Sequence, residues 1–416
     1  MSSRQLAATT YEHTPEALPP PATAQALKHP PYPTWLSNFV EQHRQFIEAL
    51  HPFPFDQPAD ITPFLSLHQN DYLRLANHPE VMQARLEANS RPRIESFSSS
   101  VFGGASQEHE HFMAQLRESM HSGDVLLTTA GWTANVGLIE AVAPPDIPIY
   151  IDADAHASMH DGIRLSQGRR IVVRHNDPCH LEKRVQIHGP GLVCIDALYS
   201  TDGVLPDLLR YIEICERYDC TLILDEAHSF GMFGEKGGGL AVELGLADRV
   251  HFRTVSLSKA LGGHGGVVAG SKEMIRNLCT RMRPVLFSSS TSAVLAAGHA
   301  KALEIVMREP ERARHCLAMA ALLRNRFHDL NIYIAGSSSQ IISIFFRNEE
   351  ACQFYQALRE RKILTSVFVY PAIPKGISLV RFSVYADLTE SNVNYIADCA
   401  IEILREMHPL EASDGL

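Results

Sequence analysis

The stretch TLILDEAH, from Thr221 to His228, decides the predicted fold class of the chain. It begins as a short apolar, β-branched strand, ends that strand in the carboxylate of Asp225, and places the imidazole of His228 three residues later. In open parallel sheets, ligands bind just beyond the carboxyl ends of the strands. At such a place Asp225 could pair with a protonated heterocyclic nitrogen and His228 could hydrogen-bond an oxygen. Alternatively, the aspartate caps a following helix.

Other short β-branched runs alternate with amphipathic stretches around this segment. In residues 208–218, for example, Leu209, Ile212 and Cys215 share one helical face. The alternation predicts an α/β protein whose large domain holds a mostly parallel, seven-stranded sheet. The predicted strands are Val125–Thr129, Ile149–Ile151, Ile171–Val173, Leu192–Asp196, Thr221–Asp225, Val250–Val255 and Gly266–Ala269.

The pattern changes toward both ends of the chain. Residues 1–34 contain a cluster of prolines that predicts a flexible arm, because proline interrupts helices and the segment has little apolar content. Residues 35–95 are predicted to form an N-terminal helical segment. The large α/β domain is expected over residues 96–290, followed by a smaller C-terminal α+β domain over residues 291–416.

Composition excludes several classes of protein. The 416 residues include 47 acidic and 37 basic side chains, a net charge of −10, with no basic block for nucleic acid or an anionic membrane. Eight irregularly spaced cysteines without a CxxC pair predict reduced thiols, not a disulfide framework or a zinc site. No apolar run approaches the roughly 18 residues of a membrane span. The N-terminus lacks the apolar core of a secretory signal, so we expect a cytoplasmic protein.

A second informative segment, VSLSKALGG, covers residues 255–263. Most lysines are solvated surface charges. Lys259, however, is the only fully charged residue in residues 255–268 and lies among hydroxyl, apolar and glycine residues. A lysine desolvated in this way has a lowered pKa and an amine suited to Schiff-base chemistry. The adjacent Ser256 and Ser258, with backbone N–H groups, would suit a phosphate.

Two weaker signals lie earlier in the chain. Gly131 and Trp132 form a turn from a predicted strand into a helix, and helix N-termini bind phosphate through free N–H groups and the helix dipole. Asp152, Asp154 and His156 have the residue types of metal ligands, but no second ligand cluster supports a metal site. The alternative is that His156 lies flat on an aromatic ligand.

Together these motifs resemble the pyridoxal-phosphate-dependent α-oxoamine synthases of the fold-type-I aminotransferase group. The resemblance extends over residues 70–384, and seven motifs occur in the order that the family has. They are Asn70–Leu73, Gly131–Asn135, Asp152–Ser158, Tyr199–Gly203, Asp225–His228, Ser256–Lys259 and Arg381.

Within the family, the chain is most similar to the long-chain autoinducer synthases of cholera-type quorum sensing. The similar stretches include residues 131–138, 188–191 and 366–368. Biotin-pathway and glycine-using members usually carry a different aromatic at the position of Trp132. They also have a Gly-Ser-Gly-Gly-Ser-Arg type of loop where this chain has residues 98–104. These departures leave the acyl and amino-acid substrates open.

The resemblance implies a role for each motif. Lys259 would bond the cofactor, pyridoxal 5′-phosphate, and later move the α-proton of the amino acid, while Asp225 would keep the pyridine nitrogen protonated. His228 would contact the phenolic oxygen of the ring, and His156 would stack on the ring face. The other implied contacts are Ser200 with the cofactor oxygen; Gly131, Trp132, Ser256 and Ser258 with the phosphate; Ser289 or Ser290 of the partner subunit with that phosphate; and Arg381, with Asn70, for the substrate carboxylate.

The implied reaction is a decarboxylative condensation of an acyl-CoA of medium or long chain with an α-amino acid or S-adenosylmethionine. Its product would be an α-aminoketone, a precursor of a quorum-sensing autoinducer, and the enzyme would be a homodimer with shared active sites. Alternatives within the family are an 8-amino-7-oxononanoate synthase, a 2-amino-3-ketobutyrate CoA ligase, a serine palmitoyltransferase and a natural-product aminoketone synthase. Alternatives outside it are a metal-dependent hydrolase and an inactive scaffold. Candidates for an acyl channel, which core packing explains equally well, are Phe53, Phe55, Phe97 and Phe102.

Overall fold

The computed structural model describes residues 31–49, 61–92, 94, 97–328, 334, 336–348, 350–370 and 372–407. The chain divides into two compact units, residues 1–55 and 56–416. In the first unit, the described helix is α1 (Thr34–Ala49), as the helical spacing of apolar residues predicts. Most of the predicted proline-rich arm, together with Phe53 and Phe55, lies outside the described residues.

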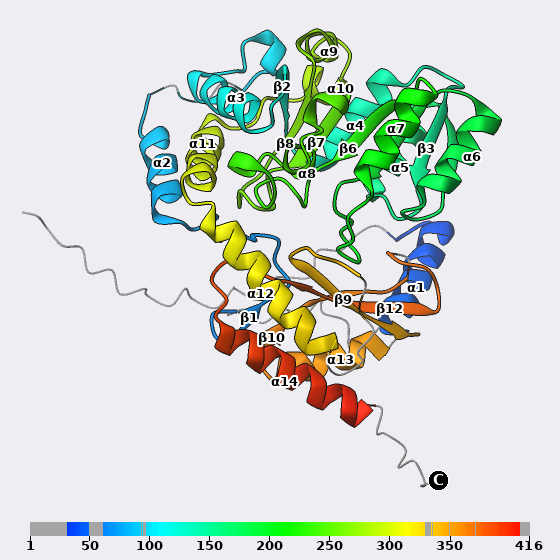
Figure 1. The fold of residues 1–416 in the computed structure, drawn as a ribbon, viewed down its shortest axis with the longest axis vertical. Coiled ribbons are helices and arrows are strands. Elements are labelled where there is room, and N and C mark those ends of the chain that lie inside the picture. The colour runs from blue at the N-terminus through cyan, green and yellow to red at the C-terminus, as the bar shows by residue number, and fades with distance from the viewer. Residues whose placement is uncertain are drawn as a thin grey trace, which may run out of the picture. The chain divides into compact units, whose positions relative to one another are not determined.

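A seven-stranded sheet forms the centre of the second unit (Figure 1). Its strands in spatial order are β2 (Asp124–Thr128), β8 (Gly266–Gly270), β7 (Phe252–Ser256), β6 (Thr221–Asp225), β5 (Leu192–Asp196), β3 (Pro148–Asp152) and β4 (Arg169–Val173). Strand β8 is antiparallel to both of its neighbours, and the pairs from β7 to β4 are parallel. The prediction of a mostly parallel, seven-stranded sheet is therefore confirmed.

Helices cover both faces of this sheet, because its strands are apolar on both sides. In β5, Leu192 and Cys194 enter a core with the two helices Gly131–Val142 (α4) and Ala157–Ser166 (α5). Val193 and Ile195 enter a core on the other face with Pro178–His188 (α6) and Leu208–Arg217 (α7). This two-residue period is that of a strand buried on both faces. The helices of this region are α2 (Pro79–Asn89), α3 (Gln107–Ser119), α4 (Gly131–Val142), α5 (Ala157–Ser166), α6 (Pro178–His188), α7 (Leu208–Arg217), α8 (Leu240–Glu243), α9 (Lys272–Leu278), α10 (Arg283–Leu286) and α11 (Ala293–Arg308).

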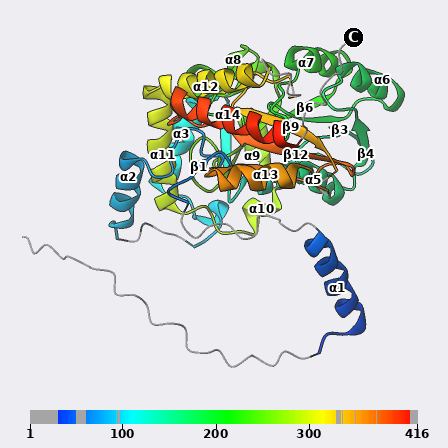
Figure 2. The ribbon, with the colours of Figure 1, turned by 90° about the horizontal axis from the view of Figure 1, so that it is seen from below.

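The C-terminal part adds a smaller antiparallel sheet in the order β11 (Ser366–Phe368), β12 (Ile377–Ser383), β9 (Ile341–Arg347). Its helices are α12 (Glu311–His328), α13 (Glu350–Glu360) and α14 (Glu390–Met407), and α12 and α14 lie side by side (Figure 2). Two short strands, β1 (Leu65–Ser66) and β10 (Ile363–Leu364), pair in parallel.

One hydrophobic core joins the two sheets of the second unit. Val255 and Val267 of the large sheet belong to the same buried cluster as Ile342 and Val380 of the small one. Helix α11, just after the predicted domain boundary, packs on α2 and α3. The predicted domain boundaries after residues 95 and 290 therefore remain predictions.

The carboxyl ends of four neighbouring strands lie on one edge of the large sheet. Asp196 of β5 is paired in register with Asp225 of β6, and Asp225 is paired with Thr254 of β7. Asp152 ends β3 on the other side of β5. This edge therefore collects polar side chains from segments far apart in the sequence, as expected of a ligand site in an open α/β sheet.

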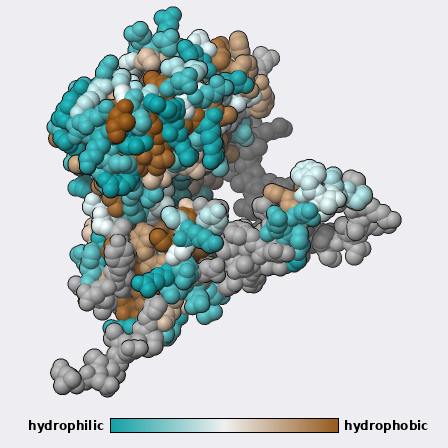
Figure 3. All heavy atoms as spheres, turned by 90° about the vertical axis from the view of Figure 1, so that its right-hand side faces the viewer, coloured by the Kyte–Doolittle hydropathy of each residue, from teal (hydrophilic) through white to brown (hydrophobic). Residues whose placement is uncertain are grey.

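On the face in Figure 3, hydrophilic residues cover much of the described surface, with hydrophobic patches between them. Among the described helices, none is long and apolar enough to cross a lipid bilayer.

Candidate active site

Asp225 is held at the end of β6 by two hydrogen bonds. Its Oδ2 accepts from Asn135 Nδ2 of α4 at 2.6 Å, and its Oδ1 accepts from the backbone N–H of Ala227 at 2.8 Å. Asn135 is itself oriented by Thr254, whose hydroxyl donates to Asn135 Oδ1 at 2.6 Å. The residues that follow Asp225 form turns, not a helix, so the helix-cap alternative is wrong. The carboxylate, 6% exposed, instead lies preorganised at the sheet edge.

Lys259 lies in the turn after β7, as its position in the sequence predicts. The pKa of its amine is lowered to about 8. Burial is the main cause, the positive charge of Arg381 acts in the same direction, and the negative charge of Asp225 opposes both. A lysine amine with this pKa is partly uncharged near neutral pH, and so has a usable lone pair. The structure therefore agrees with the expectation of a desolvated lysine.

His228 is buried in the same region and bonded to a residue that the sequence reasoning did not select. Its Nδ1 lies 2.7 Å from the hydroxyl of Tyr72, and its backbone carbonyl accepts from Gln340 Nε2 at 2.8 Å. Burial lowers the pKa of His228 well below its ordinary value, and the charges of Lys259 and Arg381 act in the same direction. His228 is therefore a neutral imidazole in this site.

His156 begins α5 and is linked to Asp225 through side chains. Its Nδ1 lies 2.7 Å from Ser158 Oγ, which accepts a hydrogen bond from Asn135 Nδ2 at 2.9 Å, and Asn135 bonds Asp225. The imidazole also meets Trp132 edge to face, with ring centroids 5.8 Å apart. The structure thus brings together His156, Trp132 and Asp225, which are far apart in the sequence.

The N-terminus of α4 lies directly against the turn that follows β7. A Cβ atom at Gly131 would come within 2.6 Å of Ser256 Cβ, so a larger residue cannot occupy this position without displacing the turn. The hydroxyls of Ser256 and Ser258 are 2.9 Å apart. The first N–H groups of a twelve-residue helix therefore lie beside two hydroxyls, an arrangement suited to a phosphate.

Arg381, in the middle of β12, reaches from the small sheet to this edge. Its Nη1 donates to the carbonyl of Ser200 at 2.8 Å, its Nη2 donates to Asn70 Oδ1 at 3.2 Å, and its guanidinium lies 5.0 Å from the ring centre of Phe368. The side chain is buried, and its Nε has no hydrogen-bond partner among the described residues. The predicted pair Arg381 and Asn70 is thus in direct contact, and the guanidinium keeps a donor for a further acceptor.

The remaining predicted site residues are less closely tied to this cluster. Ser200 enters through its backbone carbonyl, as described above. Ser289 is exposed, and Ser290 donates its hydroxyl to the carbonyl of Gly104 at 2.6 Å. The role predicted for these two serines concerns a second subunit and remains a prediction. Phe97 and Phe102 are 89% and 72% exposed, so core packing does not explain them.

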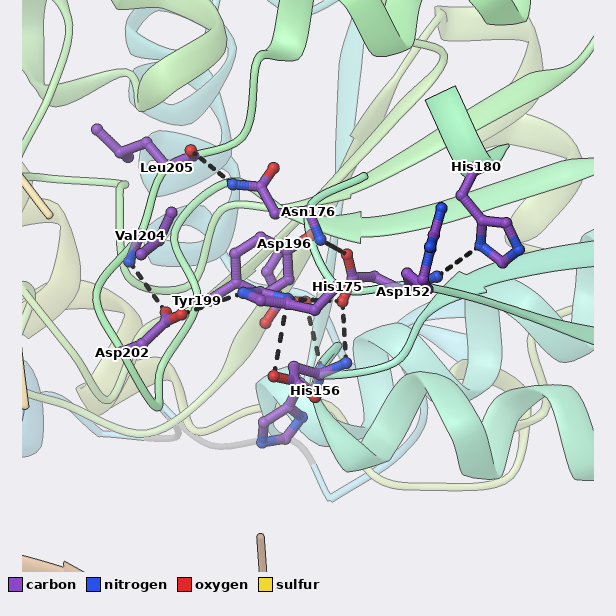
Figure 4. Close-up of polar contacts among 12 residues, drawn as sticks. Asp152, His156, His175, Asn176, His180, Asp196, Tyr199, Asp202, Val204 and Leu205 are labelled. Atoms are coloured by element: carbon purple, nitrogen blue, oxygen red, sulfur yellow. Dashed lines mark hydrogen bonds and ion pairs between the residues drawn. The ribbon is translucent and has the colours of Figure 1, made fainter. Parts of the chain in front are cut away.

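The possible metal ligands Asp152, Asp154 and His156 are used differently (Figure 4). Asp152 accepts four hydrogen bonds, from Asp154 N–H (2.9 Å), His175 Nδ1 (2.9 Å), Asn176 N–H (2.7 Å) and Tyr199 OH (2.9 Å). The N–H of His156 instead donates to Asp196 Oδ1 at 3.3 Å. Within the described ranges, no group of three or more His, Cys, Asp or Glu residues is arranged to hold a metal ion. The structure gives the hydrolase alternative no support.

Sequence reasoning missed Asn135 and Tyr72 as members of the site. Both lie inside motifs that carry the family resemblance, but the motifs alone predict no role for either side chain. A signal was available for Asn135, because it lies four residues after Gly131 and so on the same face of the helix. No comparable local signal exists for Tyr72, whose partner is 156 residues away.

A type-I pyridoxal-phosphate fold is the class that these observations define: a mostly parallel sheet with a partly buried lysine, a buried carboxylate and a buried imidazole at its carboxyl edge. The sequence model of the aminotransferase class I and II family matches residues 62–399, and the chain belongs to this family.

Two similar proteins narrow the position within the family, and a solved structure shares the fold. A CAI-1 autoinducer synthase from Vibrio campbellii is 32% identical over 333 residues, covering 79% of this chain and 84% of that protein. An 8-amino-7-oxononanoate synthase from Mycobacterium sp. (strain JLS) is 32% identical over 363 residues, covering 86% and 94%. The structure of serine palmitoyltransferase from Sphingomonas wittichii matches with a TM-score of 0.84 at 24% identity, covering 90% and 98%.

These findings confirm four predictions: the resemblance to α-oxoamine synthases, the fold class, the assignment as a pyridoxal-phosphate-dependent acyltransferase and the cofactor. The residues present also fit the cofactor on physical grounds. Gly131 lets the N-terminus of α4 approach Ser256 more closely than any side chain would allow, Asp225 offers a buried carboxylate, and Lys259 offers an amine of lowered pKa. Each of the three chemical groups of pyridoxal 5′-phosphate therefore has a candidate partner.

Proposed function

We propose that this enzyme condenses an acyl-CoA of medium or long chain with an α-amino acid or S-adenosylmethionine, with loss of carbon dioxide. The product would be an α-aminoketone that serves as the precursor of a quorum-sensing autoinducer. The observation that carries the proposal is the partly buried Lys259, whose pKa of about 8 results from burial and from Arg381, with Asp225 acting against them. The three side chains are the amine, carboxylate-binding group and ring-protonating acid that this chemistry requires.

Pyridoxal 5′-phosphate, when bound, supplies an aldehyde carbon and an electron-withdrawing ring. Asp225 would hold a proton on the pyridine nitrogen, and the bonds from Asn135 and Ala227 keep its carboxylate aimed while it does so. Gly131, Trp132, Ser256 and Ser258 would hold the phosphate at the N-terminus of α4.

Lys259 would remove the α-proton of the amino acid and later return a proton to carbon. A general base works best when its pKa is near the working pH, because it is then often uncharged yet still basic. The pKa of about 8 meets this condition, whereas a solvated lysine near 10.5 would be almost fully charged. His156, held by Ser158 and packed against Trp132, would cover one face of the ring and exclude water from it.

Arg381 would bind the carboxylate of the amino acid. Its Nε has no partner in the described part of the chain, and its bond to Asn70 is long, at 3.2 Å. A planar guanidinium with donors to spare suits a carboxylate, which accepts two parallel hydrogen bonds. Asn70 would keep the guanidinium oriented while the carboxylate is lost as carbon dioxide.

The autoinducer role is supported by the relative from Vibrio campbellii, which is called a CAI-1 autoinducer synthase. The mycobacterial 8-amino-7-oxononanoate synthase is equally identical, so a synthase of that type is the second candidate. Trp132, 44% exposed beside His156, is the residue at which the chain departs from the biotin-pathway pattern. A homodimer with shared active sites and a cytoplasmic location belong to the same proposal.

The direct test is to incubate the purified, cofactor-loaded protein with mixed acyl-CoAs and amino acids and to identify products by mass spectrometry. The amino acids would be glycine, alanine, serine, 2-aminobutyrate and S-adenosylmethionine, each with short and long acyl chains. We expect an α-aminoketone from a medium or long chain and release of free CoA. A product formed only from short acyl chains would exclude the autoinducer role, and the absence of any aminoketone would exclude the reaction.

Replacing the lysine tests the central residue of this proposal. K259A should lower product formation by roughly 10³-fold or more, because both the bond to the cofactor and the proton transfer are lost. It should also remove the yellow absorbance of the lysine-bound cofactor. The matched control is K183A, since Lys183 is an exposed lysine on α6 and should be replaceable without effect. An unchanged spectrum in K259A would remove Lys259 from this role.

A further inference from the structure

Tyr72 and His228 form a buried pair whose geometry has a chemical consequence. Tyr72 is 0% exposed and His228 is 5% exposed, and the tyrosine hydroxyl lies 2.7 Å from His228 Nδ1. The ring centroids are 6.0 Å apart and inclined by 53°, so the contact is a hydrogen bond and not a stack. The backbone of Tyr72 is anchored on both sides, because its N–H donates to the Asn70 carbonyl and its carbonyl accepts from Ala386, each at 2.8 Å.

The surroundings make the charged form of His228 unfavourable. Burial removes the water that would solvate an imidazolium, and the positive groups that face it are Lys259, Arg381 and His156. A neutral imidazole has one N–H and one bare nitrogen, and the hydrogen bond made by one nitrogen determines the role of the other. Among the described residues, the structure assigns a side-chain hydrogen bond to Nδ1 alone. Nε2 is the nitrogen left for a ligand.

The direction of the bond follows from the partners of the tyrosine. The hydroxyl has a single proton, and its two hydrogen-bond contacts of known length are to His228 Nδ1 at 2.7 Å and Asn70 Oδ1 at 3.2 Å, while the side chains of Gln340 and Ser383 also lie near it. The shorter distance is typical of a hydroxyl donor, whereas 3.2 Å is at the long end of the range. In addition, Asn70 Oδ1 already accepts from Arg381. The proton of Tyr72 therefore points to His228.

We propose that Tyr72 is a positioning residue that holds His228 as the neutral tautomer with its proton on Nε2. Nε2 is then a hydrogen-bond donor that no side chain among the described residues occupies. If the proposed function holds, on which this step rests, Nε2 would donate a hydrogen bond to the phenolic oxygen of the cofactor. The same contacts connect Arg381, Asn70, Tyr72 and His228 in series, so the group that would bind the substrate carboxylate is joined to the group that would bind the ring.

The tautomer can be measured without turnover. Full-length protein labelled with ¹⁵N-histidine, loaded with cofactor and again after its removal, would be examined by long-range ¹H–¹⁵N NMR, which distinguishes protonated from bare ring nitrogens. H228Q identifies the signals of His228 by their disappearance. We expect a proton on Nε2 and a bare, hydrogen-bonded Nδ1. A proton on Nδ1 in the unmodified protein would overturn the proposal, even if the protein makes the expected product.

Y72F removes only the hydroxyl and tests the cause. The Nδ1 signal should move to the position of a nitrogen without a hydrogen bond, or the second tautomer should appear, and kcat should fall about tenfold with little change in the KM for the amino acid. The matched control is Y211F, because Tyr211 is also buried and its hydroxyl has no hydrogen-bond partner in the described part of the chain. If Y72F leaves the His228 signals and kcat unchanged, Tyr72 has no positioning role.

Discussion

Two histidines near the same edge of the large sheet are held in opposite charge states. His175 follows β4 and lies between the turns after β3 and β5, whereas His228 follows β6. Burial lowers the pKa of both side chains. Hydrogen bonds to Asp152 and Asp202 nevertheless raise the pKa of His175 to about 10, while the pKa of His228 falls well below its ordinary value. At His175 the carboxylate partners outweigh burial, whereas at His228 burial is the largest cause and the nearby positive charges act with it.

The arrangement around His175 leaves no choice of charge state (Figure 4). Its Nδ1 lies 2.9 Å from Asp152 Oδ1 and its Nε2 lies 3.1 Å from Asp202 Oδ2. Ionised carboxylates only accept hydrogen bonds, so both nitrogens must carry protons. The imidazolium thus ties the turn that leads to His156 to the turn that follows Ser200.

Around His228 the neighbours are of the opposite kind. The pKa values of His228 and Lys259 are both lowered, first by burial and then by nearby positive charge. A group whose pKa lies near the working pH can exchange protons, as Lys259 can with its pKa of about 8. The comparison therefore separates a histidine whose fixed charge holds turns in place from a region in which burial disfavours charge and which would carry the chemistry.

The largest effect is expected at Asp225, on the side of the site that would carry the chemistry. D225N should lower kcat/KM for aminoketone formation by roughly 10²- to 10³-fold, because the carboxylate that would stabilise a protonated ring nitrogen is lost. The measurement is the initial rate of CoA release with saturating cofactor, together with the dissociation constant of the cofactor.

The matched control for this variant is D196N. Asp196 is the register partner of Asp225 on β5 and is equally buried, but burial and the charge of Asp225 raise its pKa well above the ordinary value. An amide of the same size replaces a carboxyl group whose charged form is already disfavoured by burial, so we expect D196N to change the rate by less than about threefold. Equal losses in the two variants would mean that the proposed distinction between the two carboxyl groups is wrong.

The second prediction concerns stability and the region of fixed charge. H175Q should lower the free energy of unfolding by about 2 kcal/mol. Hydrogen bonds to charged partners are lost, and Asp152, 1% exposed, stays buried without its cationic partner. The pKa of His175 is raised on folding, so its contribution is complete below pH 6.5 and declines as the pH rises through about 10. Denaturant unfolding at pH 6, 8 and 10 should therefore give a difference between H175Q and the unmodified protein that shrinks with pH.

His180 provides the control for that measurement. It lies five residues further on, where its Nδ1 accepts a single hydrogen bond from the backbone N–H of Arg174 at 2.9 Å. H180Q should cost less than about 1 kcal/mol, with no comparable dependence on pH. A difference for H175Q that grows from pH 6 to pH 10 would contradict the assignment of His175 as an imidazolium.

The strands show where sequence reasoning works and where it stops. Leu192–Asp196 and Thr221–Asp225 were predicted with the observed bounds, because both are buried on two faces and each ends in a polar residue. Strand β4 was predicted to begin at Ile171 but begins at Arg169. It lies at the edge of the sheet, and its two arginines are exposed, so the rule of a continuous apolar run does not apply there.

The site shows the same limit. Asp225, His228 and Lys259 could be selected because each follows a strand directly, and the chain brings such residues to one edge. The bonds that orient two of them cross much longer distances, from Asn135 to Asp225 over 90 residues and from Tyr72 to His228 over 156. Nothing local marks Tyr72, and the helical spacing from Gly131 places Asn135 at the site without naming its partner, because these contacts form only when the segments meet in the fold.

The smallest expected effect is a shift in the titration of Lys259. The charge of Arg381 contributes to the lowering of its pKa to about 8, so R381Q should raise that pKa, by less than one unit because burial is the larger cause. The readout is the rate at which cofactor-free protein takes up pyridoxal 5′-phosphate, measured against pH without any substrate. Only the uncharged amine reacts, so the rate should increase with pH and level off above about 8, and R381Q should move the midpoint upward.

The control is R405Q, because Arg405 is an exposed arginine of α14, and this variant should leave the midpoint in place. A midpoint that stays or falls in R381Q would show that Arg381 does not contribute to the lowered pKa of Lys259. The contrast with His175 would then depend on His228 only.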